Sequence, residues 1–116
     1  MFIKKFILIL FFYFLFVSCS KQEVQKSTIN QISIETQMLE AYREGIKELE
    51  RGDVLFAAKK FNEAELLFPQ SDLAPKSALM AAYAYYSQSY YGDAISELER
   101  FLKVYPKHKN IDYAQY

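Results

Sequence analysis

The stretch ALMAAYAYYSQSYYGDAISELERFLKVYPKHKNIDYAQY, from Ala78 to Tyr116, decides the fold, because it holds one complete helix–turn–helix and the start of another. When the sequence is shifted against itself by 37 residues, similar residues coincide along the chain. The shift pairs Gly45 with Ala82, Ala57 with Ala94, Phe61 with Leu98, Ala64 with Phe101, Phe68 with Tyr105, and Pro69 with Pro106. The chain therefore contains an internal repeat.

Each repeat has the pattern of two closely packed helices. Small residues such as Gly45 and Ala57 allow close approach, and Phe61 and its equivalent fill the space that remains. The prolines Pro69 and Pro106 end the second helix of each unit. The run GDVLFAAKKFNEAELLFP has the residue order of the second helix of a tetratricopeptide repeat, a unit of about 34 residues. The sequence predicts an all-α, tetratricopeptide-repeat α-solenoid, with the extra residues of the repeat in the connection QSDLAPK after Pro69.

The repeat domain is predicted over residues 35–116, with unit one at about 35–69 and unit two at about 76–106. Gly52 is expected to end the first helix in a left-handed conformation, and Asp53 to cap the second. In unit two the expected helices cover 76–87 and 92–104, with Ser89 and Gly92 in the turn. Adding 37 to Ala78 gives Gln115, so the third unit is expected to be truncated. The predicted solenoid therefore consists of two helical hairpins and the start of a third.

The N-terminal residues 1–18 read as a signal peptide. Lys4 and Lys5 precede an apolar run over 6–17, which is short for a membrane-spanning helix, and Ser18 is a small residue directly before Cys19. The pattern resembles a bacterial lipoprotein signal, in which the cysteine becomes the acylated first residue of the mature protein. An ordinary signal peptide with an incidental cysteine and an uncleaved short anchor are the alternatives. Cys19 is the only cysteine, so no disulfide within the chain is possible.

Residues 19–34 are polar, lack Gly and Pro, and show no sustained helical stripe, so we predict a lipidated N-terminus followed by a flexible tether. Removal of the signal takes away Lys4 and Lys5, which leaves 14 − 2 = 12 basic residues against 14 acidic ones, a net charge of −2. This charge gives no reason to expect nucleic acid as a partner.

Three features occur together in the second unit and after it: AYAYY at Ala82–Tyr86, ERF at Glu99–Phe101, and the series Pro106, His108, Asn110 and Ile111–Tyr113. With these features, the chain from about Glu35 to Tyr116, together with the lipoprotein signal, resembles the N-terminal portion of the BamD family, the tetratricopeptide lipoproteins of the outer-membrane β-barrel assembly machinery. Lys109 stands where a second proline is common in that family. The resemblance implies a non-enzymatic scaffold, anchored by lipid in the outer membrane and facing the periplasm. Its implied partners are the barrel-assembly core protein, companion lipoproteins and unfolded barrel proteins. The residue after the cysteine is Ser20 and not Asp, which by resemblance to Gram-negative lipoprotein sorting rules favours the outer membrane. The alternative is another exported tetratricopeptide lipoprotein, in pilus assembly or in cell-envelope and division coordination.

A peptide-binding groove is expected on the first helix of each unit, because that helix lines the concave side of such a solenoid. Helical spacing selects Leu39, Tyr42, Ile46, Leu49, Leu79, Tyr83, Tyr86 and Tyr113, with Tyr116 continuing the row. Each of these residues has a core-packing role as its alternative.

Catalysis, a metal site and a cofactor find no support in the sequence. His108 is the only histidine and follows a helix-ending proline, so a structural role is expected. Phosphate-binding loops, dinucleotide fingerprints and nucleophile elbows do not occur. The carboxylates on the helices are expected to be solvated, and they are Glu48, Glu50, Glu63, Glu65, Glu97 and Glu99.

Overall fold

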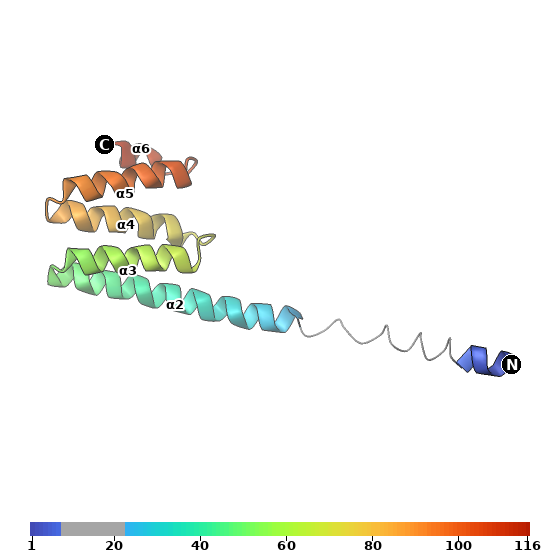
Figure 1. Cartoon of the computed structure of the whole chain (residues 1–116). Coiled ribbons are helices and arrows are strands. Elements are labelled where there is room, and N and C mark those ends of the chain that lie inside the picture. The colour runs from blue at the N-terminus through green and yellow to red at the C-terminus, as the bar shows by residue number, and fades with distance from the viewer. Residues whose placement is uncertain (8–22) are drawn as a thin grey trace. The chain divides into compact units, whose positions relative to one another are not determined.

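The computed structural model describes residues 1–7 and 23–116. Within these residues the chain is helical and contains no strand. Residues 2–7 are helical, and the labelled helices are α2 (Glu23–Arg51), α3 (Val54–Leu67), α4 (Leu73–Ser87), α5 (Tyr91–Val104) and α6 (Ile111–Gln115) (Figure 1). The chain divides into two units, Met1–Gln31 and Ile32–Tyr116. The second unit contains the consecutive hairpins, and the predicted all-α fold of tetratricopeptide type is confirmed.

The turn inside the first hairpin is built as the sequence predicts. Gly52 has a φ of +86°, a conformation in which a side chain would be strained. Asp53 caps α3, because its carboxylate accepts a hydrogen bond of 3.1 Å from the backbone N–H of Phe56. In the second hairpin the residue with positive φ is Ser89, at 65°. Gly92, predicted both as a turn residue and as the start of the second helix, lies in the first turn of α5, which begins one residue earlier at Tyr91.

A glycine allows α2 and α3 to approach closely. A Cβ atom added to Gly45 would lie 2.8 Å from both Cδ1 and Cε1 of Phe61, a ring that is fully buried. The predicted role of Gly45 as a small contact residue is thereby confirmed. The small residues Ala57 and Ala94 are also buried, as the repeat register requires.

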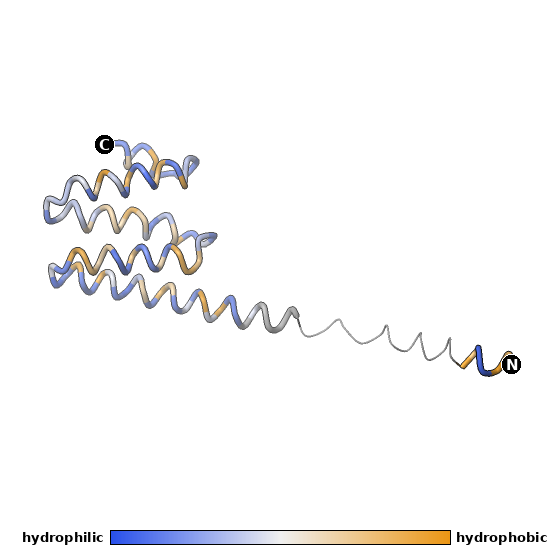
Figure 2. Tube along the Cα trace, in the orientation of Figure 1, coloured by the Kyte–Doolittle hydropathy of each residue, from blue (hydrophilic) through white to orange (hydrophobic). Residues whose placement is uncertain are grey.

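The core is rich in alanine where successive hairpins meet. Ala81 and Ala84 of α4 share a cluster with Val54 and Ala58 of α3, and all four are buried. Side chains this small let two helices pack closely with few voids. A second cluster joins α2, α3 and α4, and a third joins α4, α5 and α6; their buried members are Met38, Ala41, Ala64 and Ala74 in one and Ala78, Phe101 and Ala114 in the other. Figure 2 shows apolar and polar residues alternating along α2 and α3, as expected of helices with one buried side.

The second helices end shortly before proline. Their C-caps, Phe68 and Tyr105, have ψ angles of 75° and 56°, outside the helical range, as expected for a residue that precedes proline. The next first helix begins at Leu73, three residues earlier than predicted, with Pro75 in its first turn. Proline is tolerated there because the first backbone N–H groups of a helix have no partner within it.

The structure differs from the prediction of a flexible tether over residues 19–34. From Glu23 onward these residues form the first part of α2. Nothing between Glu23 and Ile34 breaks a helix, since the segment contains neither Gly nor Pro. Thr36 also donates a 2.8 Å hydrogen bond to the carbonyl of Ile32. Residues 19–22 of the predicted tether, with Cys19, lie outside the described residues, as does most of the predicted signal peptide.

The short helix α6 begins the third unit. It starts at Ile111, one residue after Asn110, the position to which the shift of 37 residues maps the start of α4 at Leu73. Its buried residue Ala114 packs against Phe101 and Ala78. Within the described residues, no helix is both long and apolar enough to cross a membrane.

Candidate functional site

The candidate site lies on the first helices, α2, α4 and α6. The repeat relates its residues, because a shift of 37 maps Ile46 to Tyr83 and Leu49 to Tyr86. The same shift maps Leu39 to Lys76 and then to Tyr113. Each first helix therefore contributes equivalent positions to one face.

Half of the predicted groove residues take part in helix packing. Tyr42, Ile46 and Leu49 are partly buried against the cluster that contains Phe61. The Tyr42 and Phe61 rings meet edge to face, with centroids 5.3 Å apart, an arrangement favoured by the charge distribution of aromatic rings. Leu79 is partly buried against Phe101 and its neighbours. For these four residues the structure shows the packing role that the sequence left as the alternative.

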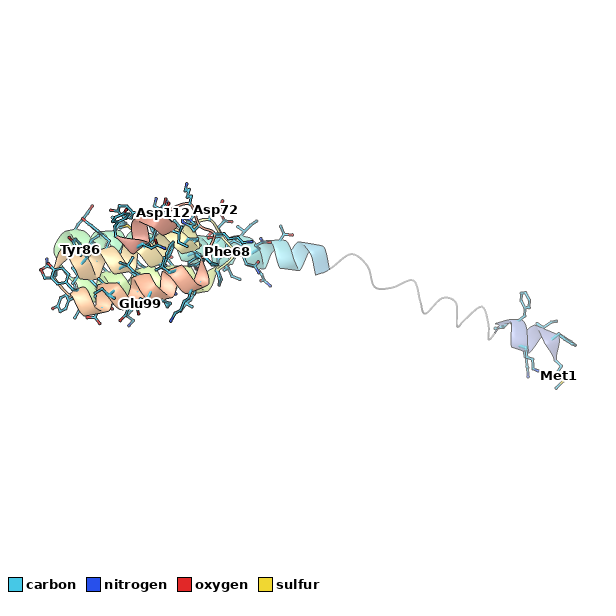
Figure 3. All side chains as sticks on the ribbon, turned by 90° about the horizontal axis from the view of Figure 1, so that it is seen from above. Met1, Phe68, Asp72, Tyr86, Glu99 and Asp112 are labelled. Atoms are coloured by element: carbon cyan, nitrogen blue, oxygen red, sulfur yellow. The ribbon has the colours of Figure 1, made fainter. Side chains whose placement is uncertain are left out.

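The other half of the predicted set is exposed. The exposed fractions are 42% for Leu39, 54% for Tyr83, 61% for Tyr86 and 80% for Tyr113. We call these four residues the exposed row. Tyr86 lies near the end of α4 opposite Asp72 (Figure 3), and its ring is 5.7 Å from that of Tyr91 at the start of α5. Tyr116 is also fully exposed. Large exposed rings that gather on one face are typical of protein-binding surfaces.

On α4, one charged residue precedes Tyr83 and Tyr86. Lys76 is the only charged residue of α4, and its side chain is exposed. Its Nζ atom lies 5.6 Å from the centroid of the Tyr42 ring, a cation–π distance. The sequence pattern did not single out Lys76. Lys76 is the repeat equivalent of Leu39 and Tyr113, both of which were selected, so this equivalence would have pointed to it.

A polar network joins the second helices of the two hairpins, and sequence reasoning missed it as well. Glu65 of α3 is buried, contrary to the prediction that it is solvated. Arg100 of α5 reaches both of its carboxylate oxygens, with Nη1–Oε1 and Nη2–Oε2 distances of 2.9 and 2.6 Å. The Tyr105 hydroxyl donates a third bond to Glu65, of 2.7 Å. Arg100 also pairs with Glu97, whose side chain is only 16% exposed, and Glu97 accepts a bond from Asn62.

The network raises the pKa values of Arg100 and Tyr105. Hydrogen bonding to Glu65 raises the pKa of Arg100, because the pair favours the charged guanidinium. Burial, followed by the bond to Glu65, raises the pKa of Tyr105, because both disfavour the phenolate. A buried carboxylate needs this full set of partners. We therefore assign the network to the joint between hairpins.

His108 has the structural role that its position predicted. Its Nδ1 atom accepts a 3.2 Å hydrogen bond from the backbone N–H of Asn110, and its ring meets Phe101 edge to face at 5.5 Å. These contacts fix the connection between α5 and α6. Within residues 1–7 and 23–116, no group of three or more His, Cys, Asp or Glu side chains is placed to hold a metal ion.

Comparison with known proteins places this arrangement in a family. Residues 34–116 match the model of the family YfiO, described as an outer membrane lipoprotein. The chain is 36% identical over 86 residues to "Outer membrane protein assembly factor BamD" of Neisseria gonorrhoeae, an overlap that covers 74% of this chain and 32% of the relative. The proteins of that name from Caulobacter vibrioides and Rickettsia prowazekii are 36% and 31% identical over 75 residues. Each of these overlaps covers 65% of this chain, and 25% and 30% of the relative respectively.

The chain thus spans about a third or less of the length of these relatives. The match begins at residue 34, inside α2, and covers the rest of the first hairpin, the second hairpin and α6. The family description confirms the predicted outer-membrane location. The chain belongs to the BamD (YfiO) family of outer membrane lipoproteins and corresponds to the N-terminal portion of its members.

Proposed function

We propose that the chain is a non-enzymatic scaffold in the assembly of outer-membrane β-barrel proteins. The observation that carries this proposal is the family match over residues 34–116 to proteins named as outer membrane protein assembly factors. The match favours barrel assembly over the alternative of pilus assembly or cell-envelope and division coordination. The assembly core protein and companion lipoproteins are the partners that this function requires.

The proposal assigns the anchor to the N-terminal residues. Residues 1–18 act as the signal peptide and Cys19 carries the acyl chains that hold the protein in the outer membrane on the periplasmic side. Support comes from the family description as a lipoprotein and from the position of Cys19 directly after Ser18. Acyl chains contribute about 0.8 kcal/mol per buried methylene, so two or more chains give a stable anchor.

The proposal assigns substrate binding to the exposed row. An unfolded barrel strand alternates aromatic and polar residues, so in extended form its rings point to one side. Tyr83 and Tyr86 offer exposed aromatic area for such rings. Their separation of three residues corresponds to about 4.5 Å along α4, which lets both contact one ring. Tyrosine provides a large contact area at a low entropic cost, which suits a surface that binds many related sequences.

A peptide titration tests this assignment. The double variant Tyr83→Ala/Tyr86→Ala is titrated with a labelled peptide from the C-terminal strand of a barrel protein. Each aromatic contact contributes about 0.5–1.5 kcal/mol, so we expect affinity to fall roughly tenfold. The control Leu55→Ala/Leu66→Ala removes comparably exposed side chains from α3 and should bind as the parent does. Equal affinities of all three proteins, with unchanged circular dichroism, would place the peptide site elsewhere.

A further inference from the structure

Lys76 differs in its surroundings from Lys60 and Arg100, two cations that pair with carboxylates of a neighbouring helix. Arg100 is held by Glu65 and Glu97, and Lys60 by Glu44 and Glu63. Lys76 makes no ion pair with any residue that the structure describes, and it lies instead over the Tyr42 ring. An exposed ammonium group that makes no ion pair remains available to an anionic ligand.

The surroundings of Lys76 select for a ligand that is both apolar and anionic. Lys76 is the only charged residue of α4, and the exposed surface that follows it on the same helix is formed by Tyr83 and Tyr86. A purely apolar ligand would leave the ammonium group unused. A highly charged ligand would gain nothing from the two rings.

Spacing along α4 sets the length of that ligand. Lys76 and Tyr83 are seven residues apart, which is two helical turns or about 10.5 Å. An extended chain advances about 3.3 Å per residue, so the same distance corresponds to three residues of a bound strand. Tyr83 and Tyr86 can flank one aromatic side chain at the far end of this span.

We propose that Lys76 recognises a carboxylate of the bound segment, while Tyr83 and Tyr86 receive an aromatic ring about three residues away. This inference rests on the function proposed for the exposed row and names the residue that gives it selectivity for charge. The carboxylate can be the free C-terminus of a peptide or an Asp or Glu side chain. Both supply the same chemistry, and the experiment separates them.

The test compares three labelled peptides with the full chain in detergent solution. All have an aromatic residue in an otherwise identical polar sequence. The first ends in a free carboxylate three residues after the ring, the second ends in an amide, and the third ends in an amide but has a Glu at that spacing. We expect the first peptide, the third, or both to bind about fivefold more tightly than the second, the effect of an exposed ion pair. Which of them does so identifies the source of the carboxylate.

Two substitutions attribute the preference to a residue. Lys76→Gln should remove the preference for the carboxylate while leaving binding of the amide peptide unchanged. The matched control is Lys59→Gln on α3, because Lys59 is also exposed and also lies over an aromatic ring, 5.9 Å from the centroid of Phe56. This variant should keep the full preference.

The outcomes that overturn the inference differ from those that overturn the proposed function. If the parent binds all three peptides equally, or if Lys76→Gln keeps the preference, the role of Lys76 is wrong, while binding to the exposed row stands as long as Tyr83→Ala/Tyr86→Ala weakens it. If the parent binds none of the peptides, both are wrong. Loss of the preference in Lys59→Gln as well would assign it to general charge and not to Lys76.

Discussion

The substitution Gly45→Ala sets two opposing effects against each other at the contact between α2 and α3. In an unobstructed helix interior, replacing Gly by Ala stabilises the protein by about 1 kcal/mol. At Gly45 the new Cβ would lie 2.8 Å from two carbon atoms of Phe61. The Phe61 ring is fully buried and packed edge to face against Tyr42, so it has little room to move. Overpacking of this kind costs about 1–3 kcal/mol.

The net expectation for Gly45→Ala is a loss of stability of up to about 2 kcal/mol, with a value near 1 as the midpoint. For a domain of this size, about 1 kcal/mol corresponds to a fall in Tm of roughly 4–8 °C. Thermal and urea unfolding, followed by far-ultraviolet circular dichroism, measure the change.

The two other glycines are matched controls with different expected signs. No atom lies within 4 Å of a Cβ added at Gly92, which is inside α5, so Gly92→Ala should raise stability by up to about 1 kcal/mol. Gly52 has a φ of +86°, so Gly52→Ala should lower stability by about 1 kcal/mol through backbone strain alone.

The second repeat suggests a second substitution that should compensate for the clash in Gly45→Ala. Its equivalents of Gly45 and Phe61 are Ala82 and Leu98, a larger residue opposite a smaller one. The double variant Gly45→Ala/Phe61→Leu should therefore lose less stability than the sum of the two single variants, because the shorter side chain relieves the clash. If Gly45→Ala stabilises the protein as much as Gly92→Ala does, or if the two substitutions are simply additive, the close contact of α2 and α3 is wrong.

Other substitutions test the remaining parts of the structure. Ala94→Leu should cost about 1–3 kcal/mol by overpacking a buried position, and an unchanged melting curve would contradict the repeat register. Arg100→Leu should cost about 1–3 kcal/mol of stability, because it leaves the buried Glu65 carboxylate with only the Tyr105 hydroxyl as a partner; the cost is below that of a fully buried pair, since the Arg100 side chain is 39% exposed. Adding Glu65→Gln to this variant should restore part of the loss, and an unchanged urea midpoint for Arg100→Leu would show that the network does not hold the hairpins together. The pKa of Tyr105 is raised in the folded state, so its contribution to stability is complete below the ordinary tyrosine pKa of about 10 and is lost as the pH rises through the folded pKa. Urea midpoints measured at increasing alkaline pH should therefore fall less steeply for Tyr105→Phe than for the parent protein, and an identical fall would assign the effect to other groups. Cys19→Ser should abolish metabolic fatty-acid labelling, and label retained by the variant would refute the lipoprotein anchor.

The residue pattern was sufficient for the packing within each hairpin because that packing repeats. Small and large residues recur after 37 residues, so the repeat marks Gly45 as a close-contact position on the first helix and Phe61 as a space-filling residue on the second. Local signals likewise predicted the capping of α3 by Asp53 and the positive φ of Gly52, since each depends only on neighbouring residues.

The network around Glu65 could not be found in the same way because it breaks the repeat. The equivalent of Glu65 in unit two is Leu102, and the residue equivalent to Arg100 in unit one is Glu63. A periodic comparison therefore gives no hint that Glu65 and Arg100 meet. The pairing depends on how one hairpin lies on the next, which sequence spacing does not specify.

The candidate site shows the same limit. Helical spacing selected the correct helices but could not tell which side chains a neighbouring helix covers. Ile46 and Leu49 are partly buried in the cluster to which Met80 of α4 contributes, whereas their equivalents Tyr83 and Tyr86 are exposed. Periodicity identifies a face, and only the packing of the next element shows how much of it is available.

Site-specific photo-cross-linking in cells tests the central claim most directly, that the exposed row binds unfolded barrel proteins. A photoreactive amino acid replaces Tyr83 on α4 or, as a control of nearly equal exposure, Leu55 on α3. After irradiation, adducts are identified by mass spectrometry. The account predicts adducts with unfolded outer-membrane barrel proteins from position 83 and none from position 55. Barrel adducts of equal yield at both positions, or none at position 83, would contradict it.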